Sequence, residues 1–125
     1  MTYKILVVDD ETLIETLFKL RFKSEIEKKI YDFIFALNGI DALNQIEQDS
    51  NIDLILTDIN MPVMDGLTLM KKLQAQSIFI PTIVVSAYSD NENTKKAKSL
   101  GAVDFLIKPI NFKILEKIIR NNLVL

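Results

Sequence analysis

The segment DLILTDINMPVMDG, residues 53–66, decides the fold of this chain. Its apolar run Leu54–Leu56 is typical of a strand that is buried on both faces of a sheet. The run leads to Asp58, and the Met61-Pro62 pair that follows favours a turn over a continuing strand or a helix. Asp58 is therefore either an ordinary turn residue or a carboxylate that the strand holds in a defined place.

Four further apolar runs alternate with segments of helical length. The expected strands are Lys4–Val8, Tyr31–Ala36, Asp53–Thr57, Thr82–Ser86 and Val103–Ile107. The second strand carries Asp32, so we expect it nearer an edge of the sheet. Strict alternation of strands and helices predicts an α/β fold, with a parallel sheet between two layers of helices and right-handed crossovers.

The spacing of apolar residues predicts the helices. A helix starting near Glu11 carries a broad apolar stripe. Its members are Leu13, Ile14, Leu17, Phe18 and Leu20. Gly39–Ile46 and Leu67–Leu73 have the same character over shorter lengths.

Capping residues mark the last two helices. Ser89 and Glu92 fit a capping box at the start of one helix, and Gly101 is a natural left-handed residue at its end. The final helix is expected after Asn111. It should bury Leu115, Ile118 and Ile119.

Length and composition indicate one globular domain over residues 1–125, because 125 residues with 49% hydrophobic content can bury a sizeable core. The net charge of −2 gives no reason to expect direct nucleic-acid binding or a membrane surface. No stretch approaches the ~20 consecutive apolar residues of a spanning helix. The first residues lead directly into a strand, so we expect no signal peptide and a cytoplasmic location.

Two absent residue types narrow the chemistry. The chain has no cysteine, which excludes disulfides, thiolate nucleophiles and thiolate-bound zinc. It also has no histidine, which excludes imidazole as a base, a metal ligand or a phosphate carrier. Any chemistry must use carboxylates, hydroxyls, lysines and a bound cation.

Polar residues stand where the central strands end. The first strand runs into Asp9 and Asp10, the third into Asp58, the fourth into Ser86 and the fifth into Lys108. Each has an ordinary explanation alone: a helix cap, a turn residue, a hydroxyl bonded to a carbonyl, or a solvated lysine. None of these explains why all of them fall at the carboxyl ends, where ligands bind in such sheets. The pattern favours a functional site.

Electrostatics indicates what this site would hold. Three carboxylates at ~4 Å spacing repel by about 4 kcal/mol per pair at an effective dielectric constant of about 20. One lysine cannot neutralise them, and a set of oxygen ligands alone favours Mg²⁺. Phosphate oxygens could fill the open positions of the ion, opposite the lysine and the hydroxyl. The residues therefore predict a phosphoryl group carried on an aspartate.

Four motifs together resemble the receiver domain of bacterial two-component response regulators. They are LVVDD (6–10), DINMPVMDG (58–66), VVSA (84–87) and FLIKP (105–109). The resemblance runs from Lys4 to the last helix. It implies a flavodoxin-like (βα)5 three-layer sandwich, in which the five-stranded parallel sheet has the order 2-1-3-4-5.

The resemblance also implies roles for the site residues. Asp58 would accept a phosphoryl group from a phosphohistidine on a sensor histidine kinase or a histidine phosphotransfer protein. Asp10, Asp58 and the backbone carbonyl of Asn60 would bind Mg²⁺ directly, with Asp9 acting mainly through water. Lys108 would pair with phosphoryl oxygens, and the hydroxyl of Ser86 would move to bond one of them.

Further family positions concern switching. Phe105 stands where the family has a switch aromatic, often a tyrosine, and Lys108-Pro109 matches a peptide that is cis in the family. Tyr88 occupies a position that tunes hydrolysis, although an ordinary loop tyrosine explains it nearly as well. Asp104 and Arg120 are candidates for pairing in a phosphorylation-dependent homodimer.

The implied output is a change on the surface formed by the helix after residue 89, the fifth strand and the last helix. This change would control an output protein or a fused output domain that the sequence does not name. The domain would not be an enzyme acting on an external substrate. It would promote its own phosphotransfer and a slow loss of its phosphoryl group.

Two other functions fit part of the pattern. A haloacid-dehalogenase-type phosphatase also uses an aspartate nucleophile, a hydroxyl, a lysine and Mg²⁺. That family has a second aspartate two residues after the nucleophile, where this chain has Asn60, and its acidic pair does not precede the nucleophile. A protein-interaction module that is never phosphorylated would be expected to lack part of the acidic set, yet every position is filled.

Overall fold

The structure is a computed structural model that describes residues 1–87 and 90–123. Its core is a five-stranded parallel sheet in the order β2-β1-β3-β4-β5. The strands are β1 (Tyr3–Val8), β2 (Tyr31–Ala36), β3 (Leu54–Asp58), β4 (Thr82–Ser86) and β5 (Asp104–Ile107). The predicted order is confirmed, and Tyr31–Ala36 is an edge strand as expected.

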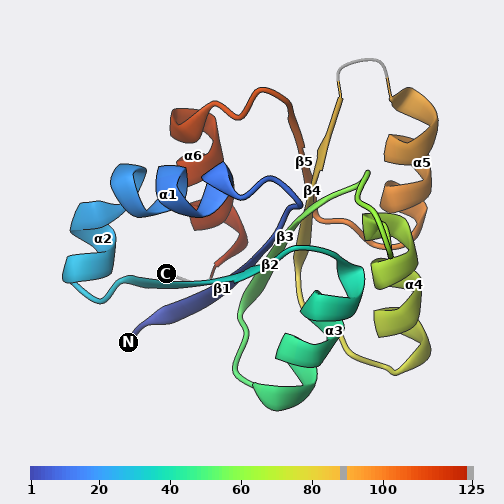
Figure 1. The fold of residues 1–125 in the computed structure, drawn as a ribbon, viewed down its shortest axis with the longest axis horizontal. Coiled ribbons are helices and arrows are strands. Elements are labelled where there is room, and N and C mark those ends of the chain that lie inside the picture. The colour runs from blue at the N-terminus through green and yellow to red at the C-terminus, as the bar shows by residue number, and fades with distance from the viewer. Residues whose placement is uncertain (88–89, 124–125) are drawn as a thin grey trace.

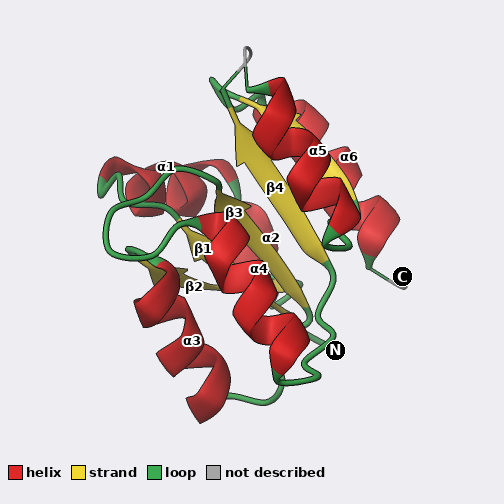
Figure 2. Cartoon of the chain, turned by 90° about the vertical axis from the view of Figure 1, so that its right-hand side faces the viewer, coloured by secondary structure: helices red, strands yellow, loops and turns green. Residues whose placement is uncertain are grey.

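Helices cover both faces of the sheet and form the outer layers of a three-layer sandwich (Figure 1). On one face lie α1 (Leu13–Arg21), α2 (Lys23–Glu27) and α6 (Phe112–Asn122). On the other lie α3 (Gly39–Gln48), α4 (Gly66–Ala75) and α5 (Asn91–Ser99), which Figure 2 shows in front of the strands. Among residues 1–87 and 90–123, no helix has both the length and the apolar character that crossing a bilayer requires.

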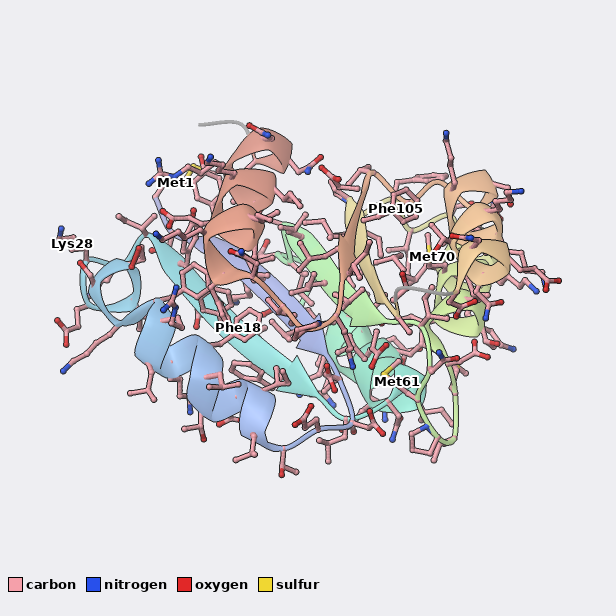
Figure 3. All side chains as sticks on the ribbon, turned by 90° about the horizontal axis from the view of Figure 1, so that it is seen from above. Met1, Phe18, Lys28, Met61, Met70 and Phe105 are labelled. Atoms are coloured by element: carbon pink, nitrogen blue, oxygen red, sulfur yellow. The ribbon has the colours of Figure 1, made fainter. Side chains whose placement is uncertain are left out.

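The central strands are buried on both faces, as continuous apolar runs require. Every residue of β3 and β4 is buried, and so are the last four residues of β1. Phe18 lies between α1 and the sheet, whereas Met70 lies on the opposite side beside α4 and α5 (Figure 3). The rings of Phe18 and Phe112 meet edge to face at a centroid distance of 5.3 Å, which ties α1 to α6.

The stripe predicted on the first helix is only partly correct. Ile14 and Phe18 are buried, but Leu13, Leu17 and Leu20 are 63%, 43% and 67% exposed. A helix lying on a sheet buries one narrow face, and the three leucines share a different face from Ile14 and Phe18. The helix begins at Leu13, close to the predicted start near Glu11, whereas the short helix α2 was not predicted.

The helix ends agree more closely with the sequence. Asn111 caps α6, which buries Leu115 and Ile119 and partly buries Ile118. Gly101 has a φ of 95°, as expected for the residue that follows α5. The capping residue of α5 is Asp90, whose side chain accepts the N–H of Asn93. The expected cap, Ser89, lies outside the described residues.

Replacing Phe18 with alanine should cost about 4 kcal/mol of unfolding free energy, because the side chain is fully buried and its neighbours cannot fill the space. Urea unfolding followed by circular dichroism measures the loss. Leu20→Ala on the same helix is the control, and it should change the free energy by less than about 0.5 kcal/mol. Equal losses for the two variants would mean that α1 packs by a different face.

Candidate functional site

The carboxyl ends of the central strands bring the predicted polar residues together. Asp58 is the last residue of β3, which lies between β1 and β4 in the sheet. Asp58 and Asp9 are buried, with 5% and 7% of their surfaces exposed, and Ser86 is buried at the end of β4. Asp10 is exposed beside them. The order of the strands thus places the carboxylates that follow β1 next to the one that ends β3.

Three carboxylates form a compact acidic cluster. Asp9, Asp10 and Asp58 each offer one oxygen, and these oxygens lie within 4.8 Å of one another. Two of the residues are buried and the third is open to solvent. The donor set is oxygen alone, as Mg²⁺ prefers, and the open side leaves room for ligands from outside the chain.

Lys108 faces this cluster from the end of β5. Its Nζ atom donates to Asp58 Oδ2 at 2.6 Å and lies 3.6 Å from Asp9 Oδ2. Burial alone lowers the pKa of Lys108, but the hydrogen bond and charge of Asp58 and the charge of Asp9 outweigh burial, so the pKa lies above its usual value. The two buried carboxylates therefore favour the charged form of Lys108.

Backbone N–H groups orient the two buried aspartates. Asp9 Oδ1 accepts from the N–H of Glu11 at 2.9 Å, and Asp58 Oδ1 accepts from the N–H of Asn60 at 3.3 Å. Burial raises the pKa of Asp9, and the Glu11 N–H and Lys108 offset only part of this rise. Each aspartate thus uses one oxygen locally and turns the other toward Lys108.

Ser86 stands next to the cluster but has a different partner. Its Oγ lies 3.3 Å from Oγ1 of Thr94 in α5, and the Thr94 hydroxyl also donates to the backbone carbonyl of Asp90 at 2.7 Å. The carbonyl of Ser86 accepts the backbone N–H of Lys108 at 2.9 Å, which joins the ends of β4 and β5. Sequence reasoning missed Thr94, because nothing in the pattern distinguishes it from a solvated helix threonine.

The remaining predicted residues lie around this site. Phe105 is half-buried, pairs in register with Val84, and packs against the cluster that contains Ala97 of α5. The Lys108-Pro109 peptide is cis, in agreement with the resemblance. Tyr88 lies outside the described residues.

Of two cavities in the structure, one lies far from the acidic cluster and the other reaches Lys108. A cavity of about 440 Å³ lies between the ends of α4 and α5, and its lining includes Met70, Phe79 and Leu100 but no charged side chain. It opens at the amino end of β4, whereas the acidic cluster lies at the carboxyl ends of the strands. A smaller one of about 250 Å³ reaches Lys108 and runs between α1 and the start of α6.

The response regulator receiver domain is the family that matches this chain, over residues 5–120. The chain belongs to this family. Similar structures agree with the match. A Francisella response regulator receiver domain (1452) superposes with a TM-score of 0.84 at 32% identity, over 97% of this chain and 96% of that one. CheY4 of Vibrio cholerae superposes with a TM-score of 0.83 at 29% identity, over 98% of this chain and 100% of that one.

Curated relatives of this receiver domain are longer bacterial regulators. The chain is 40% identical to the transcriptional regulatory protein MalR of Bacillus subtilis over 113 residues, 87% of this chain and 45% of MalR. It is 35% identical to the alkaline phosphatase synthesis regulator PhoP of the same species, over 89% of this chain and 44% of PhoP. It is 34% identical to ZraR of Salmonella typhimurium (strain LT2), over 90% of this chain and 24% of ZraR. The receiver domain thus spans less than half of these relatives.

Gly66 should be essential for the shape of the site. A Cβ atom at this position would lie 2.2 Å from the backbone oxygen of Asp58, so Gly66→Ala must move the strand end. We expect a loss of about 3 kcal/mol of unfolding free energy. Gly39→Ala is the comparison, because its Cβ would meet side-chain atoms of Met64 at 2.6–2.9 Å, and the loop that carries Met64 can yield more easily than the backbone of a buried strand, so this variant should cost about 1 kcal/mol. Chemical denaturation of both variants measures the difference, and equal losses would contradict the geometry.

Proposed function

We propose that residues 1–125 form one receiver domain in which Asp58 carries a phosphoryl group. The observation that supports this most is the cluster of Asp9, Asp10 and Asp58 at the carboxyl ends of the strands, with Lys108 paired to Asp9 and Asp58. The family match supports the phosphoacceptor role in two-component signalling. The residue roles that follow are our proposal.

The acidic cluster fits a divalent cation, because one lysine leaves it with net negative charge. Asp10, Asp58 and the carbonyl of Asn60 would hold Mg²⁺ directly, and Asp9 would act through water. When bound, the ion neutralises charge that develops on the transferred phosphoryl oxygens. Asp10 is exposed, so its carboxylate can turn toward the ion at little cost.

Asp58 is the nucleophile in this proposal. One of its carboxylate oxygens attacks the phosphorus of a phosphohistidine, the P–N bond of the donor breaks, and the imidazole leaves with the electron pair of that bond. Lys108, now on Asp58 Oδ2, moves onto a phosphoryl oxygen. The chain promotes this transfer and a slow hydrolysis of its own acyl phosphate, and it turns over no external substrate.

Phosphorylation then changes the surface formed by α5, β5 and α6. Ser86 exchanges its contact with Thr94 for a bond to a phosphoryl oxygen. Because Phe105 lies on β5, packed against the cluster that includes Ala97 of α5, a shift at the end of β4 gives its ring space to change rotamer. Tyr88 would modulate the lifetime of the acyl phosphate.

The partners follow from this role. The phosphoryl donor is a sensor histidine kinase or a histidine phosphotransfer protein, and the output is a separate protein or a fused domain. The proposal includes a cytoplasmic location and no direct binding of nucleic acid or membrane by this domain. A phosphorylation-dependent dimer through Asp104 and Arg120 would require new pairing, since Arg120 now pairs with Glu116 at 2.9 Å and Asp104 accepts from the side chain of Asn122 at 3.5 Å.

Asp58→Asn should abolish labelling by acetyl phosphate in Mg²⁺, because the amide oxygen is a poor nucleophile. Mass spectrometry of the intact protein measures labelling. Asp32→Asn, an exposed aspartate on the edge strand β2, is the control and should be labelled like the wild type. Undiminished labelling of Asp58→Asn would overturn the assignment. Continuous release of phosphate by the wild type, without stoichiometric labelling, would indicate a phosphatase instead.

Lys108→Ala should keep Mg²⁺ binding but separate phosphorylation from the surface change. The carboxylates remain, whereas the cation that follows the phosphoryl oxygen is gone. We expect the amide shifts of α5, β5 and α6 to respond to beryllofluoride in the wild type and to stay at their resting values in the variant. Two-dimensional NMR measures this, and shift changes identical to those of the wild type would contradict the role of Lys108.

A further inference from the structure

The loop between β3 and α4, residues 59–65, carries Asn60 and is anchored at both ends. At its start, the N–H of Ile59 donates to the carbonyl of Val85 in β4 at 3.1 Å. At its end, the N–H of Gly66 donates back to the carbonyl of Ile59 at 2.9 Å, and the Asp65 side chain caps α4. These bonds fix the two ends of the loop but not its middle.

The middle of the loop turns sharply at Val63. This residue has a φ of 69°, and the N–H of Met64 donates to the carbonyl of Pro62 at 2.7 Å, which closes a three-residue turn. A β-branched residue at positive φ is strained, and such a turn persists only where its surroundings hold it. Val63 is itself 76% exposed, so its own side chain contributes little packing.

The amino end of α3 supplies an anchor for the middle of the loop. The first N–H groups of a helix have no partner within the helix. In α3 the N–H of Gly39 donates to the carbonyl of Met64 at 2.9 Å, while the side chain of Asn38 caps the N–H of Asp41. Gly39 is buried, and Met64 packs against the core cluster that includes Ala42 of the same helix. A helix of the neighbouring βα unit thus binds the loop that carries Asn60.

Gly39 also leaves the space that this contact needs. A Cβ atom there would come within 2.6 Å of Met64 Cγ, 2.8 Å of its Sδ and 2.9 Å of its Cβ. The backbone of Gly39 does not have positive φ, so alanine is allowed by conformation and excluded only by Met64. Figure 3 shows Met61 of the same loop on the side of the sheet that α3 covers. Any residue larger than glycine must push the loop away from α3.

We infer that Gly39 is a positioning residue for the metal site: it holds Met64, and through it the loop, so that the carbonyl of Asn60 stays in place as a ligand. The inference rests on the proposed function, because it concerns Mg²⁺ at the acidic cluster. It assigns a role in that site to the start of α3, which supplies no ligand. Loss of a contact that holds a metal ligand in place typically lowers metal affinity by about 10-fold or more.

The test compares Mg²⁺ affinity in Gly39→Ala and in the wild type by isothermal titration calorimetry. We expect the dissociation constant to rise about 10-fold in the variant. In metal-free NMR spectra, the amides of Asn60 and Val63 should shift in the variant, which reports the loop independently of the metal. The double variant Gly39→Ala/Met64→Ala removes two of the three close contacts, so both the affinity and the amide shifts should return toward wild-type values.

Gly101→Ala is the control for a general loss of stability. Gly101 has positive φ and nothing within 4 Å of its Cβ position, so alanine strains the backbone at the far end of α5 without touching the loop. This variant should bind Mg²⁺ like the wild type. The inference is overturned if Gly39→Ala binds Mg²⁺ with wild-type affinity or if the double variant recovers no affinity. It is also overturned if Gly101→Ala loses as much Mg²⁺ affinity as Gly39→Ala. Failure of the wild type itself to bind Mg²⁺ would overturn the proposed function as well.

Discussion

The close approach of like charges is the constraint on which the rest of this receiver domain depends. Two buried carboxylates pair with Lys108 and a third, exposed carboxylate lies beside them, and the sheet must hold all three against their mutual repulsion. At ~4 Å each such pair costs about 4 kcal/mol at an effective dielectric constant of about 20. A flexible loop would move the charges apart. Here the carboxylates follow β1 and end β3, two neighbouring strands buried over most of their length, so they cannot separate without disturbing the core.

The two helix layers keep those strands in place. On one face aromatic rings from α1, β2 and α6 meet at centroid distances near 5 Å, with Phe18 in contact with Phe33 and Phe112. On the other face α3 and α4 pack against the apolar side of β1 and β3. The carboxyl ends remain open, so the core supplies the rigidity and the loops supply the ligands. The loop after β3 bonds to β4, to itself and to α3.

Local sequence patterns predicted the parts of the fold that depend on local chemistry. Continuous apolar runs identified the strands, and Asn111 and Gly101 marked helix ends because capping and positive φ are properties of single residues. The rotation of α1 was not predictable, since both Phe18 and Leu17 are apolar and only the sheet decides which one is buried. The acidic cluster was predictable because strand ends converge in a parallel sheet.

Contacts between segments that are distant in the sequence could not be predicted, for a physical reason. Two such contacts join the hydroxyls of Thr94 and Ser86, and the N–H of Gly39 and the carbonyl of Met64. Both depend on how α5 and α3 are placed relative to the sheet. Neither residue belongs to a periodic pattern or a charged motif. Their roles can be recognised only when the distances are known.

The contact between Ser86 and Thr94 has a consequence for the balance between resting and active populations. In the proposed mechanism, activation must break it before the hydroxyl can reach a phosphoryl oxygen. A neutral hydrogen bond contributes about 1 kcal/mol net, which corresponds to roughly a fivefold preference between two states. In that mechanism, a chain with this contact would spend less time in the active conformation before the signal arrives, and the threonine in α5 would set part of the background level of output.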